Sequence, residues 1–190
     1  MQKTSLKIML SGALLAALVG IIHAQSDTAK LHVGKVDIVF DKATYTPSLL
    51  HLMGHAKMTS DDYDLYAADI KAYTLPGSKA GASGTQSGLQ QAVAEGGATP
   101  GSQVVAHIRQ PLQSEDFEID SDRAVYVPDH TRPSGGSMKF TSHVKVITKS
   151  GFLAVPSLST FETATVLLGA GSDYPKIETG AGHITLTPAQ

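Results

Sequence analysis

The stretch DKATYTPSLLHLMGHAKMTSDDYDLYAADIKAY, residues 41–73, decides the fold, because it predicts three consecutive strands joined by two turns. Apolar and polar residues alternate along it with the period of two that a strand with one buried face shows. Polar residues at 46–48 and 59–62 interrupt the alternation and mark the turns. A shift of phase near Ala67 and Ala68 is typical of a bulge.

Two pieces of this stretch recur further along the chain. Residues 41–45 (DKATY) return as residues 122–126 (DRAVY), and residues 50–58 (LHLMGHAKM) return as residues 138–146 (MKFTSHVKV). Such internal similarity indicates a protein built by stacking copies of one β unit, each of which cannot bury its apolar face alone.

The rest of the chain also consists of predicted strands separated by turns and loops. Short, turn-bounded runs rich in β-branched and aromatic residues predict further strands at 35–40, 89–94, 103–109, 163–168, 174–178 and 183–187. Residues 75–88 are rich in Gly, Ser and Ala and are predicted to form a flexible loop. No window beyond the first two dozen residues has helical periodicity. The sequence therefore predicts a single all-β domain over residues 25–190.

Composition excludes several classes of function. The chain has 190 residues, 42% of them hydrophobic, which is enough for one domain with a real core. It has no cysteine, so disulfides, thiol nucleophiles and thiolate metal sites are excluded. Its formal charge of -2, without a basic run, and its lack of tryptophan argue against nucleic acid as a partner.

The N-terminus has the outline of a secretory signal peptide. Lys3 and Lys7 precede an apolar run over residues 8–22, and the small Ala24 follows. The run is shorter than the roughly 20 apolar residues that span a membrane. We therefore expect cleavage after Ala24 and export of a soluble protein, with an uncleaved membrane anchor as the alternative.

No catalytic, metal or cofactor site is predicted. His51 and His55 stand about 13 Å apart if they lie on one strand, too far to share an ion. His55 and His143 hold equivalent repeat positions and are predicted to lie on the outer face. No nucleophile elbow, phosphate loop or dinucleotide fingerprint occurs.

The acidic residues are interpreted as structural. Asp61, Asp62 and Asp64, like the pair at 115–116, are predicted to be solvated turn residues rather than catalytic carboxylates. The repeated aspartates Asp41, Asp69 and Asp122 are predicted to bend the chain through side-chain to backbone hydrogen bonds. A non-enzymatic protein is the expectation.

Residues 54–58 (GHAKM), 63–73 (YDLYAADIKAY) and 122–146 resemble the repeated hairpin of the LptA/OstA-like family of lipopolysaccharide-transport periplasmic proteins. The resemblance covers residues 35–151 and weakens over residues 152–190. It implies an antiparallel β-jellyroll, a rolled and open-ended sheet built from repeated hairpins, whose interior carries lipopolysaccharide acyl chains through the periplasm.

The resemblance also implies partners. These are lipopolysaccharide or a similar lipid, an LptC-like protein in the inner membrane and an LptD-like protein in the outer membrane. Copies of the chain would join end to end through edge strands, for which residues 35–40 and 183–187 are the candidates. If the N-terminus is uncleaved, the protein is closer to the anchored LptC-like component.

The alternating apolar residues form the candidate lipid-binding set. A trough lined by them would bury acyl methylenes, each worth roughly 0.8 kcal/mol. A closed sandwich core has the same alternation, so a ligand-free structural module of the envelope is the alternative. The predicted inward residues are Val36, Ile38, Phe40, Leu50, Leu52, Met58, Leu65, Val104, Ile108, Phe117, Ile119, Met138, Phe140, Val144 and Val146.

Overall fold

The computed structural model confirms the all-β prediction. It describes residues 29–33, 36–46, 48–74, 89–97, 102–110, 115–131, 135–150, 157–169 and 175–185. These residues form 13 strands of one sheet, in which every pairing is antiparallel. The described part contains no helix long and apolar enough to cross a membrane.

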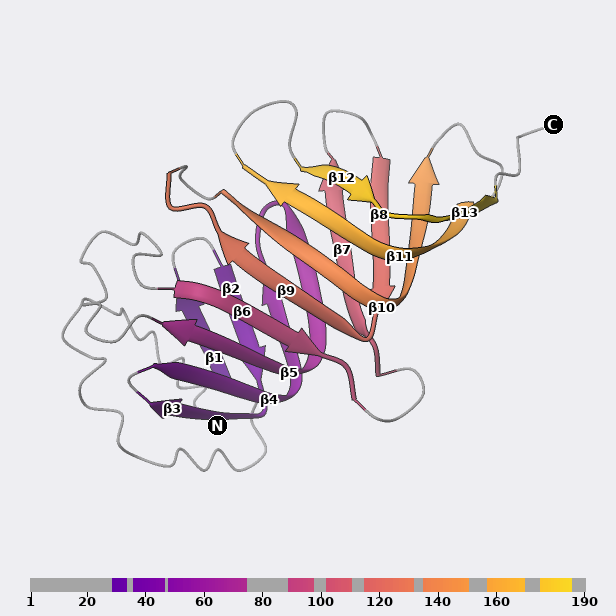
Figure 1. Ribbon diagram of the computed structural model, residues 1–190. Coiled ribbons are helices and arrows are strands. Elements are labelled where there is room, and N and C mark those ends of the chain that lie inside the picture. The colour runs from indigo at the N-terminus through magenta and orange to yellow at the C-terminus, as the bar shows by residue number, and fades with distance from the viewer. Residues whose placement is uncertain are drawn as a thin grey trace, which may run out of the picture.

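The strands are β1 Ala29–Val33, β2 Val36–Phe40, β3 Lys42–Thr46, β4 Leu49–Thr59, β5 Tyr63–Thr74, β6 Leu89–Glu95, β7 Val104–Gln110, β8 Glu115–Ser121, β9 Arg123–Pro128, β10 Gly136–Ser150, β11 Ser157–Leu168, β12 Lys176–Thr179 and β13 Gly182–Thr185. Most strands of the sheet pair with a strand next to them in the chain, whereas β2 pairs with β4, β5 with β7, β6 with β9, β8 with β10 and β11 with β13 (Figure 1).

The sheet is folded along one line into two layers. Strands β4, β5, β10 and β11 run through both layers, so that the first half of β4 pairs with β3 and its second half pairs with β2. The chain changes layer at the fold line between two short strands in four places. These pairs of short strands are β2 and β3, β6 and β7, β8 and β9, and β12 and β13. Layer A contains β3, β6, β9 and β12, layer B contains β1, β2, β7, β8 and β13, and the four long strands join the layers.

The two sequence copies occupy equivalent places in the folded sheet. The pairing of β2, β3, β4 and β5 in the first copy is repeated by β8, β9, β10 and β11 in the second. In each copy the register between the two long strands shifts at the fold line, between Met53 and Ala56 and between Thr141 and Val144. The first shift lies opposite Ala68, where the sequence predicted a bulge.

The fold line in the first copy is shaped by residues with left-handed backbone. Gly54 has φ 72° and His55 has φ 45°. A Cβ added to Gly54 would lie 2.6 Å from Asp41 Oδ2, so glycine fits this position for steric as well as conformational reasons. The backbone amide of Asp41 donates to the Gly54 carbonyl, and His55 Nδ1 lies 2.8 Å from Asp41 Oδ2.

The second copy repeats this corner with one substitution. Ser142 and His143 have φ 65° and 54°. The amide of Asp122 donates to the Ser142 carbonyl, and His143 Nδ1 lies 2.6 Å from Asp122 Oδ2. The chain bends at Asp41 and Asp122 as predicted, but their carboxylates contact histidines rather than the predicted backbone groups. The prediction is wrong for Asp69, which lies within β5 with its carboxylate beside His51.

One prediction about the sheet needs correction. Residues 35–40 were predicted to be an edge strand, but β2 is paired on both sides, with β1 and with β4. The sequence missed β1, and the outer strands of the described sheet are β1 and β3 at one end and β12 and β13 at the other. Beyond residue 152, β11 pairs along nearly the whole of β10, so this segment extends the sheet.

Candidate functional site

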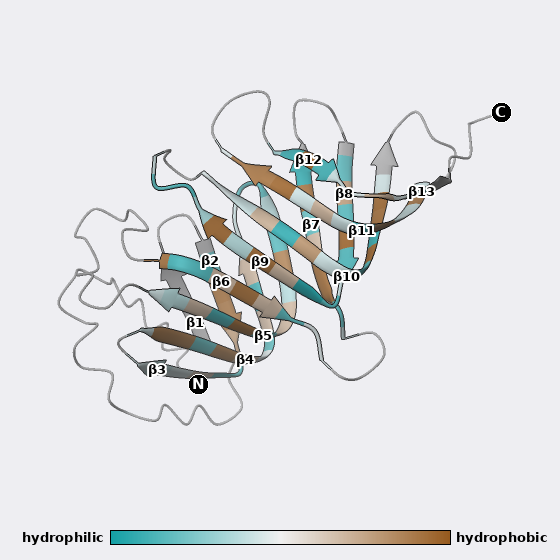
Figure 2. Cartoon of the chain, viewed as in Figure 1, coloured by the Kyte–Doolittle hydropathy of each residue, from teal (hydrophilic) through white to brown (hydrophobic). Residues whose placement is uncertain are grey.

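The candidate site is the apolar interior between the two layers. Inward residues on neighbouring strands are paired by register, so they line up in rows across the sheet. Brown and teal bands alternate along β10 in Figure 2, which is the alternation of inward apolar and outward polar side chains.

One continuous row crosses each layer. The central row of layer A is Tyr45, Leu50, Ala72, Ala92, Tyr126, Met138, Val166 and Ile177. The central row of layer B is Ile38, Met58, Leu65, Ala106, Ile119, Val146 and Ser159. The interior is therefore apolar along almost the full width of the sheet.

The structure brings the predicted inward residues together in this interior. The buried ones are 0 to 6% exposed, and the others pack against them. The exception is Val36, whose side chain lies outside the described residues. The buried group is Ile38, Leu52, Leu65, Val104, Ile108, Ile119, Met138, Phe140, Val144 and Val146, and the group packed against it is Phe40, Leu50, Met58 and Phe117.

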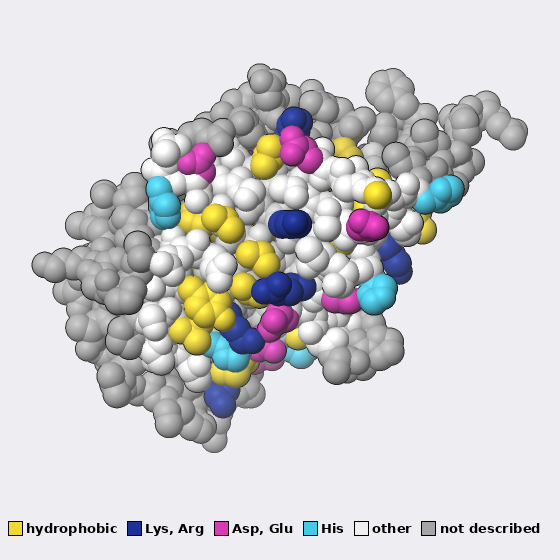
Figure 3. All heavy atoms as spheres, viewed as in Figure 1, with side chains coloured by type: hydrophobic (Ala, Val, Ile, Leu, Met, Phe, Trp, Pro, Cys, Tyr) yellow, Lys and Arg dark blue, Asp and Glu magenta, His cyan; other side chains and the backbone are white. Residues whose placement is uncertain are grey.

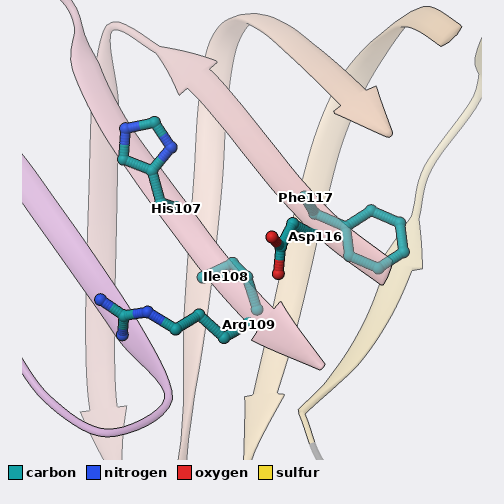
Figure 4. A pocket seen from close by; sticks show the side chains of 5 residues that line it. All are labelled: His107, Ile108, Arg109, Asp116 and Phe117. Carbon is teal, nitrogen blue, oxygen red and sulfur yellow. The ribbon is translucent and has the colours of Figure 1, made fainter. Parts of the chain in front are cut away.

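The strands end on the side of the interior opposite the fold line, which we call the mouth. In layer B the outermost interior row at the mouth is Tyr63, Ile108, Phe117, Thr148 and Ser157, each paired with the next. A hollow of about 300 Å³ opens beside this row, lined by residues 107–109 and 116–117. Figure 4 shows Phe117 projecting from β8 away from His107 and Arg109 of β7.

Beside the hollow, Arg109 connects β7 to the turn before β5. Its Nη1 donates to the Ser60 carbonyl at 2.8 Å and its Nη2 donates to Asp64 Oδ2. Burial raises the pKa of Asp64, but a hydrogen bond with Thr59 and the Arg109 guanidinium outweigh burial, so the pKa lies below its usual range. The prediction that Asp64 is a solvated turn residue is wrong, since it lies in β5 with its side chain 17% exposed.

Two tyrosines bring hydroxyl groups into the apolar interior. Tyr63 of layer B is buried, and this burial raises the pKa of its hydroxyl, which Tyr126 of layer A raises further. The Tyr126 hydroxyl donates to the Gly135 carbonyl at 3.1 Å. Tyr63 is thus held as a neutral phenol at physiological pH.

The outer faces carry paired charges, with hydrophobic side chains between them (Figure 3). Lys71 Nζ lies 2.7 Å from Glu95 Oε2, and His51 Nε2 lies 3.0 Å from Asp69 Oδ1. Figure 3 shows Lys, Arg, Asp and Glu side chains spread over the outer face of layer A. His55 and His143 lie on the outside, with side chains 93% and 80% exposed, as their repeat positions predicted. Among the described residues no group of three or more His, Cys, Asp or Glu is placed to hold a metal ion.

Sequence reasoning missed one part of the interior. The first half of β11 turns Ser157 and Ser159 inward, where each is 6% exposed. The alternation that identified other strands depends on large apolar residues, and here the inward positions are small and polar. Their register with β10 is the signal that places them, and the sequence alone does not supply it.

The chain resembles known proteins in structure only. No family model and no curated protein matches the chain. Among solved structures, the chain is similar to LptH, the LptA homologous periplasmic component of the conserved lipopolysaccharide transport device from Pseudomonas aeruginosa. The TM-score is 0.49 and the identity 10%, over 79% of this chain and 99% of that chain.

Proposed function

We propose that this protein is a non-enzymatic periplasmic carrier that holds the acyl chains of lipopolysaccharide, or of a similar lipid, between its two layers. The observation that carries the proposal is the pair of continuous apolar rows that face each other across the interior. The described sheet is not closed into a barrel, since its outer strands at the two ends do not pair with each other. Acyl chains gain roughly 0.8 kcal/mol for each buried methylene, so such an interior would retain them while sugars and phosphates stay in water.

Lipid entry requires the layers to part at the mouth. The core residues are at most 9% exposed, so the interior is filled by its own side chains without a ligand. At the fold line the layers are joined by the backbone of four long strands, whereas at the mouth no strand of the described residues runs from one layer to the other. An acyl chain that enters at the mouth would replace contacts between side chains. The free-energy cost of parting the layers is therefore lowest on this side.

The sequence resemblance supports the direction of transfer and the partners. The protein would take lipid from an LptC-like inner-membrane protein and pass it to an LptD-like outer-membrane protein. Copies of the chain would join end to end, with β12 and β13 of one copy meeting β1 and β3 of the next. Residues 1–24 would be removed on export. The mass of the exported protein distinguishes this from an anchored LptC-like form, which would keep them.

A ligand-free structural module is the second candidate, and the filled interior favours it. Gentle extraction of the exported protein followed by mass spectrometry of bound lipid separates the two. The carrier is expected to retain an acylated lipid in near-stoichiometric amount, released when the protein is unfolded. A folded protein without lipid, taken from cells that make the lipid in excess, would favour the structural module.

A further inference from the structure

The outer face of strand β8 carries a row of acidic side chains. The alternate residues of this strand point into the interior, so Asp116, Glu118 and Asp120 point outward from layer B. Residues two apart on one face of a strand are about 7 Å apart, so these carboxylates repel one another. The acidic residue that follows β8, Asp122, has its carboxylate against His143 at the fold line.

The neighbouring strands give Glu118 a partner that Asp120 lacks. His107 of β7 lies opposite Glu118, and its Nδ1 is 3.4 Å from Glu118 Oε2. The β7 residue opposite Asp120 is the apolar Val105, and the β10 residue opposite it is Lys145. Asp120 Oδ1 is nonetheless shielded from solvent and has no hydrogen-bond partner among the described residues. A carboxylate in this position is poorly compensated.

The surroundings of Asp120 favour its neutral form. Burial raises the pKa of its carboxyl group above the ordinary value, and the negative charge of Glu118 raises this pKa further. Lys145 and His107 act in the opposite direction without reversing the shift. Protonation of Asp120 therefore removes both a desolvation cost and a repulsion within the row.

The sign of the effect on stability follows from the direction of this shift. A carboxyl group with a higher pKa in the folded than in the unfolded chain binds its proton more tightly in the folded chain, so protonation stabilises the fold. Ionised Asp120 thus weakens the fold at neutral pH. The stability is gained as the pH falls through the native pKa, and the gain is complete below the ordinary carboxylate value.

We propose that Asp120 is a proton-uptake site that tightens the pairing of β8 with β7 and β10 when the surroundings become acidic. One proton passes from water to the Asp120 carboxylate, and the row on β8 loses one of its three negative charges. The site would help to keep the sheet intact in acid, where the ion pair of Asp64 with Arg109 is lost. This role is independent of the proposed carrier function.

Two matched variants test the proposal. Asp120→Asn removes the titrating group and keeps the size and polarity of the side chain. Asp116→Asn is the control, because Asp116 is an exposed member of the same row and lies opposite Arg109. Each variant removes one negative charge, so an effect of net charge is common to both. Denaturant unfolding from pH 7 to pH 3 measures the unfolding equilibrium constant of each mature protein.

We expect Asp120→Asn to lower the unfolding equilibrium constant about threefold or more at pH 7, and its ratio to the wild type to approach one below pH 4. Asp116→Asn should change the constant by less than about twofold over the whole range. If Asp120→Asn does not fold, the Asp120 carboxyl carbon of the wild type is followed by NMR. It should titrate at a higher pH than an ordinary aspartate.

Three results would overturn the proposal. One is equal stability of Asp120→Asn and the wild type at pH 7, or a ratio that does not change with pH. Another is an equal gain in both variants, which would assign the effect to net charge rather than to Asp120. The third is an Asp120 carboxyl group that titrates at or below the ordinary value.

Discussion

At the residue scale, the fold line depends on left-handed backbone at two equivalent corners. Gly54→Ala should lower the free energy of unfolding by about 1 to 3 kcal/mol, because alanine at φ 72° is strained and its Cβ would meet the Asp41 carboxylate. The reciprocal control Ser142→Gly removes such strain and should be neutral or stabilising by up to about 1 kcal/mol. Denaturant unfolding measures both. A neutral Gly54→Ala would show that the corner does not require glycine.

Also at the residue scale, Asp64 and Arg109 predict a dependence of stability on pH. Because the native pKa of Asp64 is depressed, its contribution is complete above the ordinary carboxylate pKa and is lost as the pH falls through the lower native value. Arg109→Gln should cost about 1 to 3 kcal/mol at pH 7, since it leaves a buried carboxylate without its cation. The cost should shrink as the pH falls below 4 and protonation neutralises Asp64.

The matched control for Arg109 is Lys71→Gln, which breaks a more exposed ion pair with Glu95. It should cost less than about 1 kcal/mol at the same pH. Unfolding curves collected from pH 7 to pH 3 check both variants. Equal costs in the two variants, or a cost of Arg109→Gln that does not change with pH, would rule out this role of Asp64.

At the scale of elements, the two Asp–His pairs bend β4 and β10 in the same way. The bends are also held by backbone hydrogen bonds from Asp41 and Asp122. In a double-mutant cycle of Asp122→Ala and His143→Ala, we therefore expect a coupling of only about 0.2 to 1 kcal/mol, as for other exposed pairs. The same cycle at Asp41 and His55 should give a similar value. A coupling above about 2 kcal/mol in either copy would mean that the contact between the two side chains itself holds the bend.

Elements with large apolar residues at every second position were predictable from the sequence. The strand β7 was predicted from the alternating apolar residues Val104, Ala106 and Ile108. The inward faces of β4 and β10 were predicted from the repeated apolar residues at 50–58 and 138–146. The strand β1 was not predicted, and β11 was predicted only in its second half. In the first half of β11 the inward residues are serines, so pairing with β10, rather than local pattern, decides its structure.

At the scale of the whole molecule, the repeat predicted that copies stack into one sheet, but not that the sheet folds along a line of paired corners. That fold depends on contacts between residues distant in the sequence, such as the backbone hydrogen bonds of Asp41 with Gly54 and of Asp122 with Ser142. The inward position of the candidate lipid-binding residues was predictable for the same reason as the core, because the alternation places both on the inner face. The alternation of apolar and polar residues does not distinguish a core side chain that contacts a lipid from one that contacts only other side chains, because both positions require the same pattern.

The central claim is that the interior receives acyl chains. A photo-crosslinking amino acid is placed at Phe140, which is fully buried and inward, and separately at Lys139, which is exposed and outward. The mature protein is irradiated in cells, purified and analysed by mass spectrometry for lipid adducts. The account predicts a lipid adduct at position 140 and none at position 139. A folded protein with no lipid adduct at position 140 would contradict the carrier function and favour a dry structural core.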